Sequence, residues 1–183
     1  ALIERGAEFE FDKRTLTVKR PIKAGKFHIP ANISSQFITG LLLTLPLLEG
    51  DSEIVLTTPM ESKAYVDLTI DVMEHFGVRI ERDKDSFLVE GNQQYRPSEY
   101  LVESDFSAAA FFLVAGALGS DVRLRGLNLN SLQGDKEILN ILKDCGAEVI
   151  VDEKNEIRVI TDEIKPISID VRDIPDLVPP ITS

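Results

Sequence analysis

Hydrophobic and polar positions follow the same order three times along the chain. In each copy, apolar residues at helical spacing end at a glycine, and an alternating strand, a charged turn and a second strand follow. The three glycines are Gly6, Gly77 and Gly146, which lie 71 and 69 residues apart. A repeat of this size indicates a folding unit that the chain uses several times.

The pattern predicts two helices and four strands in each whole unit. Helices are indicated by apolar spacings of three and four residues, as in Val66, Ile70 and Met73. Hairpins are indicated by alternation around Asp-Lys turns, and glycines after helices favour left-handed caps. In the first whole unit we expect a strand at 25–29, a helix at 34–48, a strand at 52–57, a helix at 62–76, and strands at 78–82 and 87–90.

The second whole unit is expected to repeat this order, and a third unit begins after it. A strand at 167–171 opens the third unit, which stops inside its first helix after Pro175-Asp176. The chain also opens in mid-unit before Gly6, so we expect it to be a piece of a longer protein. The second unit is predicted as a strand at 100–103, a helix at 105–118, a strand at 122–127, a helix at 135–145, and strands at 148–151 and 157–160.

Composition fits an ordinary globular protein and argues against two classes of partner. The 183 residues are 43% hydrophobic and 28% charged. The longest apolar run, 37–48, is too short to span a bilayer, so no membrane partner is expected. A net charge of −11 repels polyanions, so no nucleic-acid partner is expected either. The same charge disfavours small phosphorylated ligands unless fixed cations elsewhere hold them. The single cysteine, Cys145, excludes an internal disulfide and fits a reducing compartment.

The candidate chemistry lies at helix starts. Ser34, Ser35 and Gln36 precede an apolar run, so hydroxyls and free backbone N–H groups converge where the helix dipole favours an anion. Capping alone explains one of the two serines. In Ser62-Lys63-Ala64-Tyr65 the serine can cap, and the lysine either contacts a ligand or a partner carboxylate or is simply solvated. Tyr65 either covers a ligand ring or packs against the sheet.

Carboxylates begin the helices of the second unit. We expect Asp105 and Asp135 to be N-caps, and Asp176, after Pro175, could be one as well. His28 and His75 are isolated, and no metal or cofactor motif is present, so neither a metal nor a cofactor is expected. The polar stretch 91–98 contains a proline and favours a linker.

Taken together, these segments resemble the 5-enolpyruvylshikimate-3-phosphate (EPSP) synthase family, over essentially the whole chain. The residues that carry the resemblance are Ser34-Ser35-Gln36-Phe37, Ser62-Lys63-Ala64-Tyr65-Val66-Asp67, Asp105-Phe106-Ser107-Ala108-Ala109, Leu132-Gln133-Gly134-Asp135 and Ile174-Pro175-Asp176.

The resemblance implies a fold and an activity. Enzymes of this family transfer the enolpyruvyl group of phosphoenolpyruvate to the 5-hydroxyl of shikimate 3-phosphate, in the pathway to aromatic amino acids. Their fold is α/β, with two lobes of three βαβαββ units each. Residues 1–94 would belong to the first lobe and 105–183 to the second, with a hinge at 95–104. A cytoplasmic monomer without a cofactor is expected.

The resemblance also assigns roles to single residues. Ser34, Ser35 and Ser62 would bind the 3-phosphate, Gln36 would touch both substrates, and Tyr65 would line the shikimate pocket. Asp176 would contact the shikimate hydroxyls and act as the general base. The basic residues and the glutamate of the family site fall outside this chain, so the chain alone is expected to be inactive. Pro179-Pro180 is unusual where the family helix continues.

Three alternatives compete with this interpretation. The sister enzyme that uses UDP-N-acetylglucosamine shares the repeat but lacks the Ser-Ser-Gln motif. RNA 3′-phosphate cyclase uses related units, but the acidic chain disfavours it. A non-catalytic binding module built from the repeats stays open.

Overall fold

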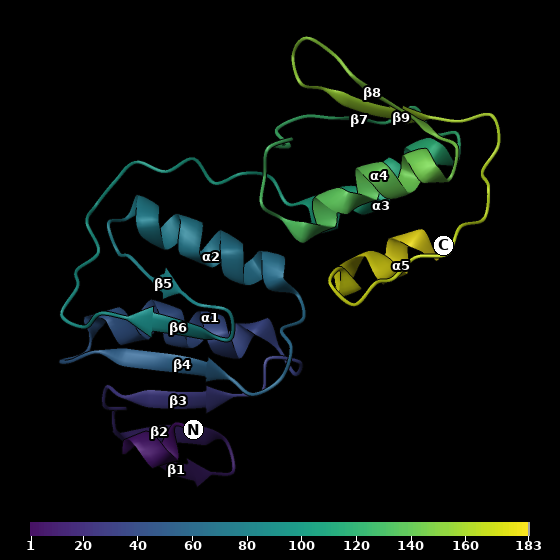
Figure 1. The fold of residues 1–183 in the computed structure, drawn as a ribbon. Helices are drawn as coiled ribbons and strands as arrows, with labels where there is room; N and C mark the ends of the chain where they lie inside the picture. Colours follow the sequence, from purple (N-terminus) through teal and green to yellow (C-terminus); the bar gives the residue numbers. More distant parts are fainter. Residues whose placement is uncertain (183) are drawn as a thin grey trace. The chain divides into compact units, whose positions relative to one another are not determined.

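The computed structural model describes residues 1–182 and divides the chain into two compact units. The first unit runs from Ala1 to Glu99 and the second from Tyr100 onward, and each is described by itself (Figure 1). The hinge role predicted for 95–104 stays a prediction. None of the described helices is long and apolar enough to cross a membrane.

The first unit begins with a helical turn and a hairpin. A 3-10 turn at Ile3–Arg5 ends at Gly6, whose φ of 87° is left-handed, as the predicted cap requires. Strands β1 (Glu8–Asp12) and β2 (Thr15–Arg20) then pair antiparallel as a two-stranded sheet. The hairpin predicted after Gly6 is therefore confirmed.

The first whole unit has the predicted βαβαββ order. Its sheet runs β3-β4-β6-β5, with β3 and β4 parallel and the other pairs antiparallel. The helix predicted at 34–48 is shorter, because Pro46 lacks an N–H and the chain continues as a 3-10 turn. The elements are β3 (Lys26–Ile29), α1 (Ser35–Thr44), η2 (Leu45–Leu47), β4 (Ser52–Leu56), α2 (Lys63–His75), β5 (Glu81–Arg82) and β6 (Ser86–Val89).

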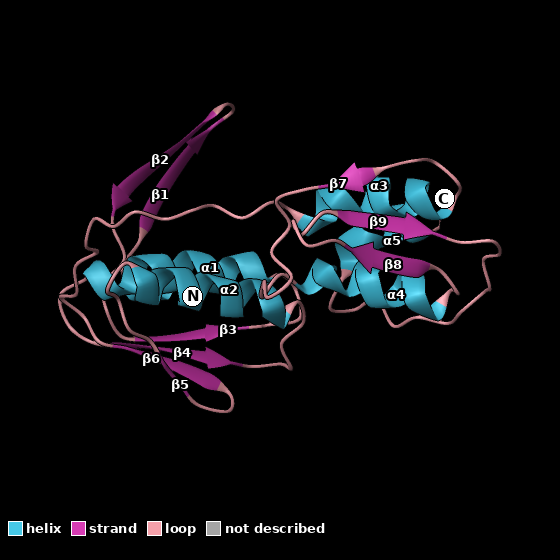
Figure 2. Ribbon diagram, turned by 90° about the horizontal axis from the view of Figure 1, so that it is seen from above, coloured by secondary structure: helices cyan, strands magenta, loops and turns pink. Residues whose placement is uncertain are grey.

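Both helices of this unit cover one face of its sheet (Figure 2). The buried core lies between these two layers and contains Phe27, Ile38, Leu42, Ile54 and Phe87. Helix α2 presents Val66 and Met73 to the same core, as its apolar spacing predicts. Packing against this core thus fixes the carboxyl ends of β3 and β4 and, with them, the loops that follow these two strands.

The second unit has a smaller sheet with its helices on one face. The sheet runs β7-β9-β8 and is antiparallel throughout. Helices α3 and α4 lie between this sheet and α5 (Figure 1). The elements are α3 (Phe106–Ala117), β7 (Arg123–Leu124), η3 (Gly134–Glu137), α4 (Ile138–Asp144), β8 (Glu148–Val151), β9 (Ile157–Ile160), η4 (Pro175–Leu177) and α5 (Val178–Ile181).

Two predicted strands in the second part of the chain are wrong, and two further elements there are shorter than expected. In the first whole unit, the strand predicted at 78–82 is likewise reduced to β5, Glu81–Arg82. Residues 100–103 form no strand, and Leu101 and Val102 are 92% and 81% exposed, so neither face of the segment is buried. Residues 167–171 alternate in burial but belong to no sheet, since no neighbouring strand pairs with them. The strand predicted at 122–127 is reduced to β7, and the helix predicted at 135–145 begins as the 3-10 turn η3.

Two glycines of the first unit give a matched test of its packing. An alanine Cβ at Gly91 would overlap the Gly50 backbone and lie 2.7 Å from the Leu48 carbonyl oxygen, whereas one at Gly40 would meet nothing within 4 Å. We expect Gly91→Ala to lower the free energy of unfolding by about 2 kcal/mol or more. Gly40→Ala should raise it by about 0.5–1 kcal/mol, because the glycine lies inside helix α1. Equal denaturation midpoints for the two variants would contradict the packing described.

Candidate functional site

Helix α1 begins at the predicted serine pair, and one of the two serines is its cap. Ser34 is extended, with φ −166° and ψ 130°, and its Oγ accepts a hydrogen bond from the Gln36 N–H at 3.2 Å. The predicted capping is thereby confirmed and assigned to Ser34. The first turn of α1 contains no acidic residue, so nothing in it repels an anion.

The second serine of the pair, Ser35, does not cap the helix. Ser35 is the first residue of α1 and is 9% exposed, while Gln36 beside it is exposed. Because Ser34 already supplies the cap, the Ser35 hydroxyl is not needed to begin the helix. The helix start therefore offers a hydroxyl and an exposed carboxamide in addition to its cap, which suits a small anionic ligand.

The loop before helix α2 differs from the prediction. Ser62 has φ 53° and ψ 41°, the left-handed region, and makes no side-chain cap bond to α2. The expectation that its hydroxyl caps this helix is wrong, because a cap residue needs an extended backbone. A serine held at positive φ is uncommon, and such residues concentrate at functional sites.

Tyr65 and Lys63 lie in the first turn of α2. Tyr65 is half-buried, and its N–H donates to the Ser62 carbonyl oxygen at 3.2 Å. Its own carbonyl oxygen accepts from the Thr69 hydroxyl at 2.7 Å. Lys63 is exposed and is the only lysine or arginine between residues 29 and 65. This part of the chain therefore supplies hydroxyl groups rather than charge.

The fold brings the two loops together at one edge of the sheet. The loop with Ser34 follows β3 and the loop with Ser62 follows β4, and carboxyl ends of parallel strands meet at the same edge. Thr58 joins them, since its hydroxyl accepts hydrogen bonds from the N–H groups of Ala31 and Asn32 at 2.8 and 3.1 Å. Sequence reasoning missed Thr58, because a threonine after a strand carries no signal of a partner 27 residues away.

The predicted general base lies in the second unit. Asp176 is exposed and belongs to the 3-10 turn η4, which the buried Leu177 anchors in the core. The chain after it forms the four-residue helix α5 despite Pro179-Pro180. The proximity of Asp176 to the serines stays a prediction.

The two other predicted caps have different outcomes. Asp105 caps α3 as expected, accepting from the N–H groups of Ser107 and Ala108 at 3.0 and 3.2 Å. The cap predicted at Asp135 is wrong, because this side chain is 1% exposed and accepts from the Ser107 hydroxyl instead. It therefore ties the start of η3 to the first turn of α3.

A polar network holds the chain just before α3. Glu103 accepts hydrogen bonds from Ser131, Asn128 and Gln133, and Gln133 also binds the backbone of residues 104 and 106. Burial opposes ionisation of Glu103, but the three hydrogen bonds and the charge of Lys136 outweigh it and lower the pKa. Sequence reasoning missed this network as well.

The Glu103 network predicts a pH dependence of stability. The folded pKa lies below the ordinary value of 4.5, so the ionised carboxylate stabilises the folded state above pH 4.5. This contribution is lost as the pH falls through the lowered value. We expect the stability difference between the wild type and Glu103→Gln to be constant above pH 4.5 and to shrink below it. Denaturant unfolding between pH 3 and 7 measures it, and a difference unchanged at pH 3 would contradict the network.

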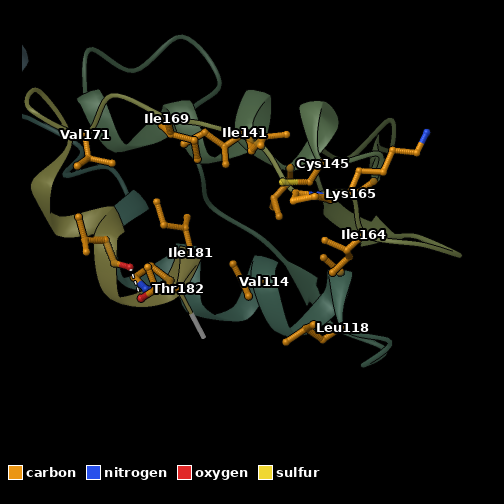
Figure 3. A pocket seen from close by; sticks show the side chains of 17 residues that line it. Val114, Leu118, Ile141, Cys145, Ile164, Lys165, Ile169, Val171, Ile181 and Thr182 are labelled. Atoms are coloured by element: carbon orange, nitrogen blue, oxygen red, sulfur yellow. Dashed lines mark hydrogen bonds between the residues drawn. The ribbon is translucent and has the colours of Figure 1, made fainter.

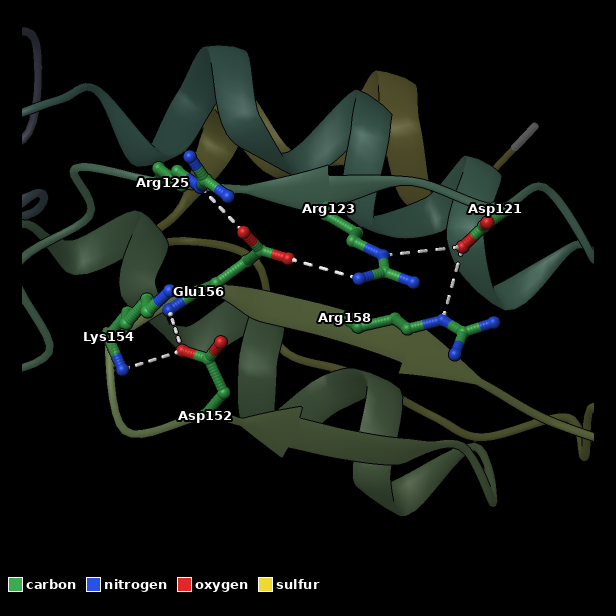
Figure 4. A network of polar contacts seen from close by, with 7 residues as sticks. All are labelled: Asp121, Arg123, Arg125, Asp152, Lys154, Glu156 and Arg158. Carbon is green, nitrogen blue, oxygen red and sulfur yellow. Dashed lines mark hydrogen bonds and ion pairs between the residues drawn. The ribbon is translucent and has the colours of Figure 1, made fainter.

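Charged side chains on the sheet of the second unit pair with one another (Figure 4). The buried Glu156 pairs with Arg125 at 2.5 Å and with Arg123 at 3.6 Å, and Asp121 lies 3.3 Å from Arg158. Glu156 and Asp121 thus already have arginine partners, and Asp152 accepts hydrogen bonds from the N–H groups of Lys154 and Glu156, so we interpret the cluster as structural. Within residues 1–182, no group of three or more His, Cys, Asp or Glu side chains is placed to hold a metal ion.

An apolar cavity of about 430 Å³ lies within the second unit (Figure 3). Its walls come from α3, α4, α5 and the segment 164–171, and include Val114, Ile141, Cys145 and Ile169. Burial raises the pKa of the Cys145 thiol, and the charge of Asp144 adds to the effect. None of the predicted site residues lines this cavity. Its lining is mostly apolar and offers few groups that could bind a phosphate.

Comparison with known proteins gives one consistent family. Residues 1–183 match the family model of EPSP synthase (3-phosphoshikimate 1-carboxyvinyltransferase). A 3-phosphoshikimate 1-carboxyvinyltransferase of Clostridium perfringens is 45% identical over 175 residues, which are 95% of this chain and 41% of the relative. One from Clostridium novyi is 50% identical over 165 residues, 90% of this chain and 38% of the relative. The chain thus spans about two fifths of the length of these relatives.

The solved structures agree on the fold. An EPSP synthase from Acinetobacter baumannii superposes with a TM-score of 0.70 at 23% sequence identity, covering 97% of this chain and 42% of that one. At this identity the likeness shows the fold alone. It confirms the α/β class that the repeat and the resemblance predict.

Proposed function

The chain belongs to the EPSP synthase family, and from this premise we propose that the whole protein is a 3-phosphoshikimate 1-carboxyvinyltransferase. It transfers the enolpyruvyl group of phosphoenolpyruvate to the 5-hydroxyl of shikimate 3-phosphate and releases phosphate. The observation that carries the proposal is the start of α1, where Ser34 caps the helix and the Ser35 hydroxyl is not needed for capping.

The hydroxyl groups of the first unit form the phosphate subsite. Ser34, Ser35 and Ser62 bind the 3-phosphate of shikimate 3-phosphate, Gln36 contacts both substrates, and Tyr65 lines the shikimate pocket. Two facts support this assignment: the serine-bearing loops follow adjacent parallel strands, and Ser62 is held at positive φ. A compact phosphate fits converging hydroxyl and backbone N–H donors at a helix start.

Asp176 acts as the general base on the acceptor. The 5-hydroxyl oxygen bonds to the enolpyruvyl carbon that carries the phosphate while a proton adds to the methylene carbon, so that the double bond opens. The bond between the same carbon and the phosphate oxygen then breaks, and loss of a methylene proton restores the double bond. The hydroxyl proton must leave as the new bond forms, so a carboxylate within hydrogen-bond reach accelerates the step. The exposure of Asp176 on the turn η4 is compatible with such a contact.

The cations for two phosphorylated substrates come from the rest of the protein. This chain has a net charge of −11, and Lys63 is the only lysine or arginine between residues 29 and 65. The 183 residues alone are therefore proposed to be inactive. We further propose a cytoplasmic monomer in which 95–104 is the hinge between lobes, in keeping with the polar 91–98 segment and the single cysteine.

The proposal is tested by phosphate release from phosphoenolpyruvate with either of two acceptors. We expect the whole protein to release phosphate with shikimate 3-phosphate and not with UDP-N-acetylglucosamine. Release only with the nucleotide sugar would mean that the serine pair had been misread. No release with either acceptor would favour a non-catalytic binding module.

A further inference from the structure

One threonine hydroxyl fastens the two serine loops to each other. Thr58 lies two residues after β4, and its Oγ1 accepts from the N–H groups of Ala31 and Asn32 at 2.8 and 3.1 Å. The same hydroxyl donates to the Asn32 Oδ1 at 2.9 Å. A hydroxyl has one donor and two acceptor positions, so the Thr58 hydroxyl is fully used.

The Thr58 hydroxyl accepts hydrogen bonds from two backbone N–H groups, and one of them is closed off from water. Ala31 is completely buried, at 0% exposure, so water cannot readily replace Thr58 as the acceptor of its N–H. Removing the acceptor would leave the Ala31 N–H unpaired, and the loop would have to move to bring this group to water. The N–H of the exposed Asn32 can reach water where it lies. The Glu61 N–H also donates to the Ala31 carbonyl oxygen at 3.3 Å, so both loops share this junction.

The junction lies between the two groups of proposed phosphate ligands. Asn32 is two residues before Ser34, and Thr58 is four residues before Ser62. Pro59 follows Thr58 and restricts its backbone to extended conformations, which limits the freedom of the loop on this side. The spacing of the serines across the two loops is therefore set largely at Thr58.

We propose that Thr58 is a positioning residue for the phosphate subsite, acting through the backbone of Ala31 and Asn32. It contacts no substrate; it keeps the loop of Ser34 and Ser35 in register with the loop of Ser62. The inference rests on the proposed function, since it takes these serines as the ligands of the 3-phosphate. Groups that must hold a ligand within a fraction of an ångström need such support from the residues behind them.

Three variants of the whole protein test the proposal. Thr58→Val keeps the shape and removes the hydroxyl, Thr58→Ser keeps the hydroxyl, and Thr57→Val removes a neighbouring exposed hydroxyl that makes no hydrogen bond within residues 1–182. We expect Thr58→Val to raise the KM and Kd for shikimate 3-phosphate about tenfold, because the Ala31 N–H loses its acceptor and the loop with Ser34 and Ser35 shifts. The KM for phosphoenolpyruvate and the kcat should stay within about twofold of the wild type, because only the acceptor subsite loosens.

The serine variant separates positioning from general instability. Thr58→Ser should bind shikimate 3-phosphate within about twofold of the wild type, and Thr57→Val should be unchanged. Should Thr58→Val fail to fold, Asn32→Ala gives the same test, because it removes the acceptor that orients the Thr58 hydroxyl. For Asn32→Ala we expect about threefold weaker binding.

The outcomes distinguish this inference from the function it rests on. Failure of the wild-type protein to bind shikimate 3-phosphate would contradict both. Normal binding by the wild type with unchanged affinity in Thr58→Val, or in Asn32→Ala if it replaces that variant, would contradict the positioning role alone. A loss that Thr58→Ser does not restore, or that Thr57→Val shares, would contradict it as well.

Discussion

Replacing Asp176 by asparagine in the whole protein is expected to lower kcat about a thousandfold, the usual effect of removing a general base. Asparagine keeps the size and polarity of the side chain but cannot accept the proton of the 5-hydroxyl. The KM for phosphoenolpyruvate should change little, because the proposed role concerns the acceptor. Steady-state phosphate release at saturating substrates measures the effect.

The matched control is Asp162→Asn, which removes another exposed carboxylate of the second unit. Asp162 is not one of the proposed site residues, so this variant should keep full activity. Comparable kcat values for Asp176→Asn and the wild type would remove Asp176 from the mechanism. Comparable losses in the two variants would point to charge rather than to a base.

Ser35→Ala is expected to weaken binding of shikimate 3-phosphate by about 10- to 100-fold, because a hydrogen bond to a charged group contributes about 1.5–3 kcal/mol. Stability should change little, since Ser34 rather than Ser35 caps α1. Calorimetric titration of the whole protein with shikimate 3-phosphate gives the affinity directly. Thermal unfolding of the same samples shows whether the helix start is intact.

Ser52→Ala is the control for this measurement. Ser52 is a buried serine of the same unit, and its hydroxyl accepts from the Gly25 N–H at 3.2 Å, away from helix starts. Its replacement should affect stability and leave the affinity unchanged. Unchanged affinity in Ser35→Ala would instead support the non-catalytic binding module.

Much of the fold follows from local pattern, and the exceptions have a common cause. Local pattern predicts the left-handed glycines, the two helices of the first whole unit and its four strands, one of which is shortened to Glu81–Arg82. The strands predicted at 100–103 and 167–171 fail because a strand also requires a partner for its backbone groups, which alternation does not reveal. In 167–171 the alternation correctly indicated one-sided burial, since Ile167, Ile169 and Val171 pack against the core.

Candidate site residues were likewise predictable where their partners are close in the sequence, and not where their partners are distant. Capping by Ser34 and Asp105 depends on the next two or three residues and is visible in the sequence. Asp135 fails as a cap because its partner, Ser107, is 28 residues away. Thr58 escaped notice for the same reason, and the positive φ of Ser62 is a property of the folded loop.

The central claim is that the whole protein breaks the bond between carbon and the phosphate oxygen of phosphoenolpyruvate and moves the enolpyruvyl group to an acceptor. A phosphorus-31 NMR spectrum of a completed reaction with shikimate 3-phosphate tests it directly. The account predicts that the phosphoenolpyruvate signal is replaced by inorganic phosphate, while one phosphomonoester signal remains, shifted to that of the enolpyruvyl product. Consumption of phosphoenolpyruvate with an unchanged shikimate 3-phosphate signal, or the appearance of a second phosphoester on the acceptor, would contradict it.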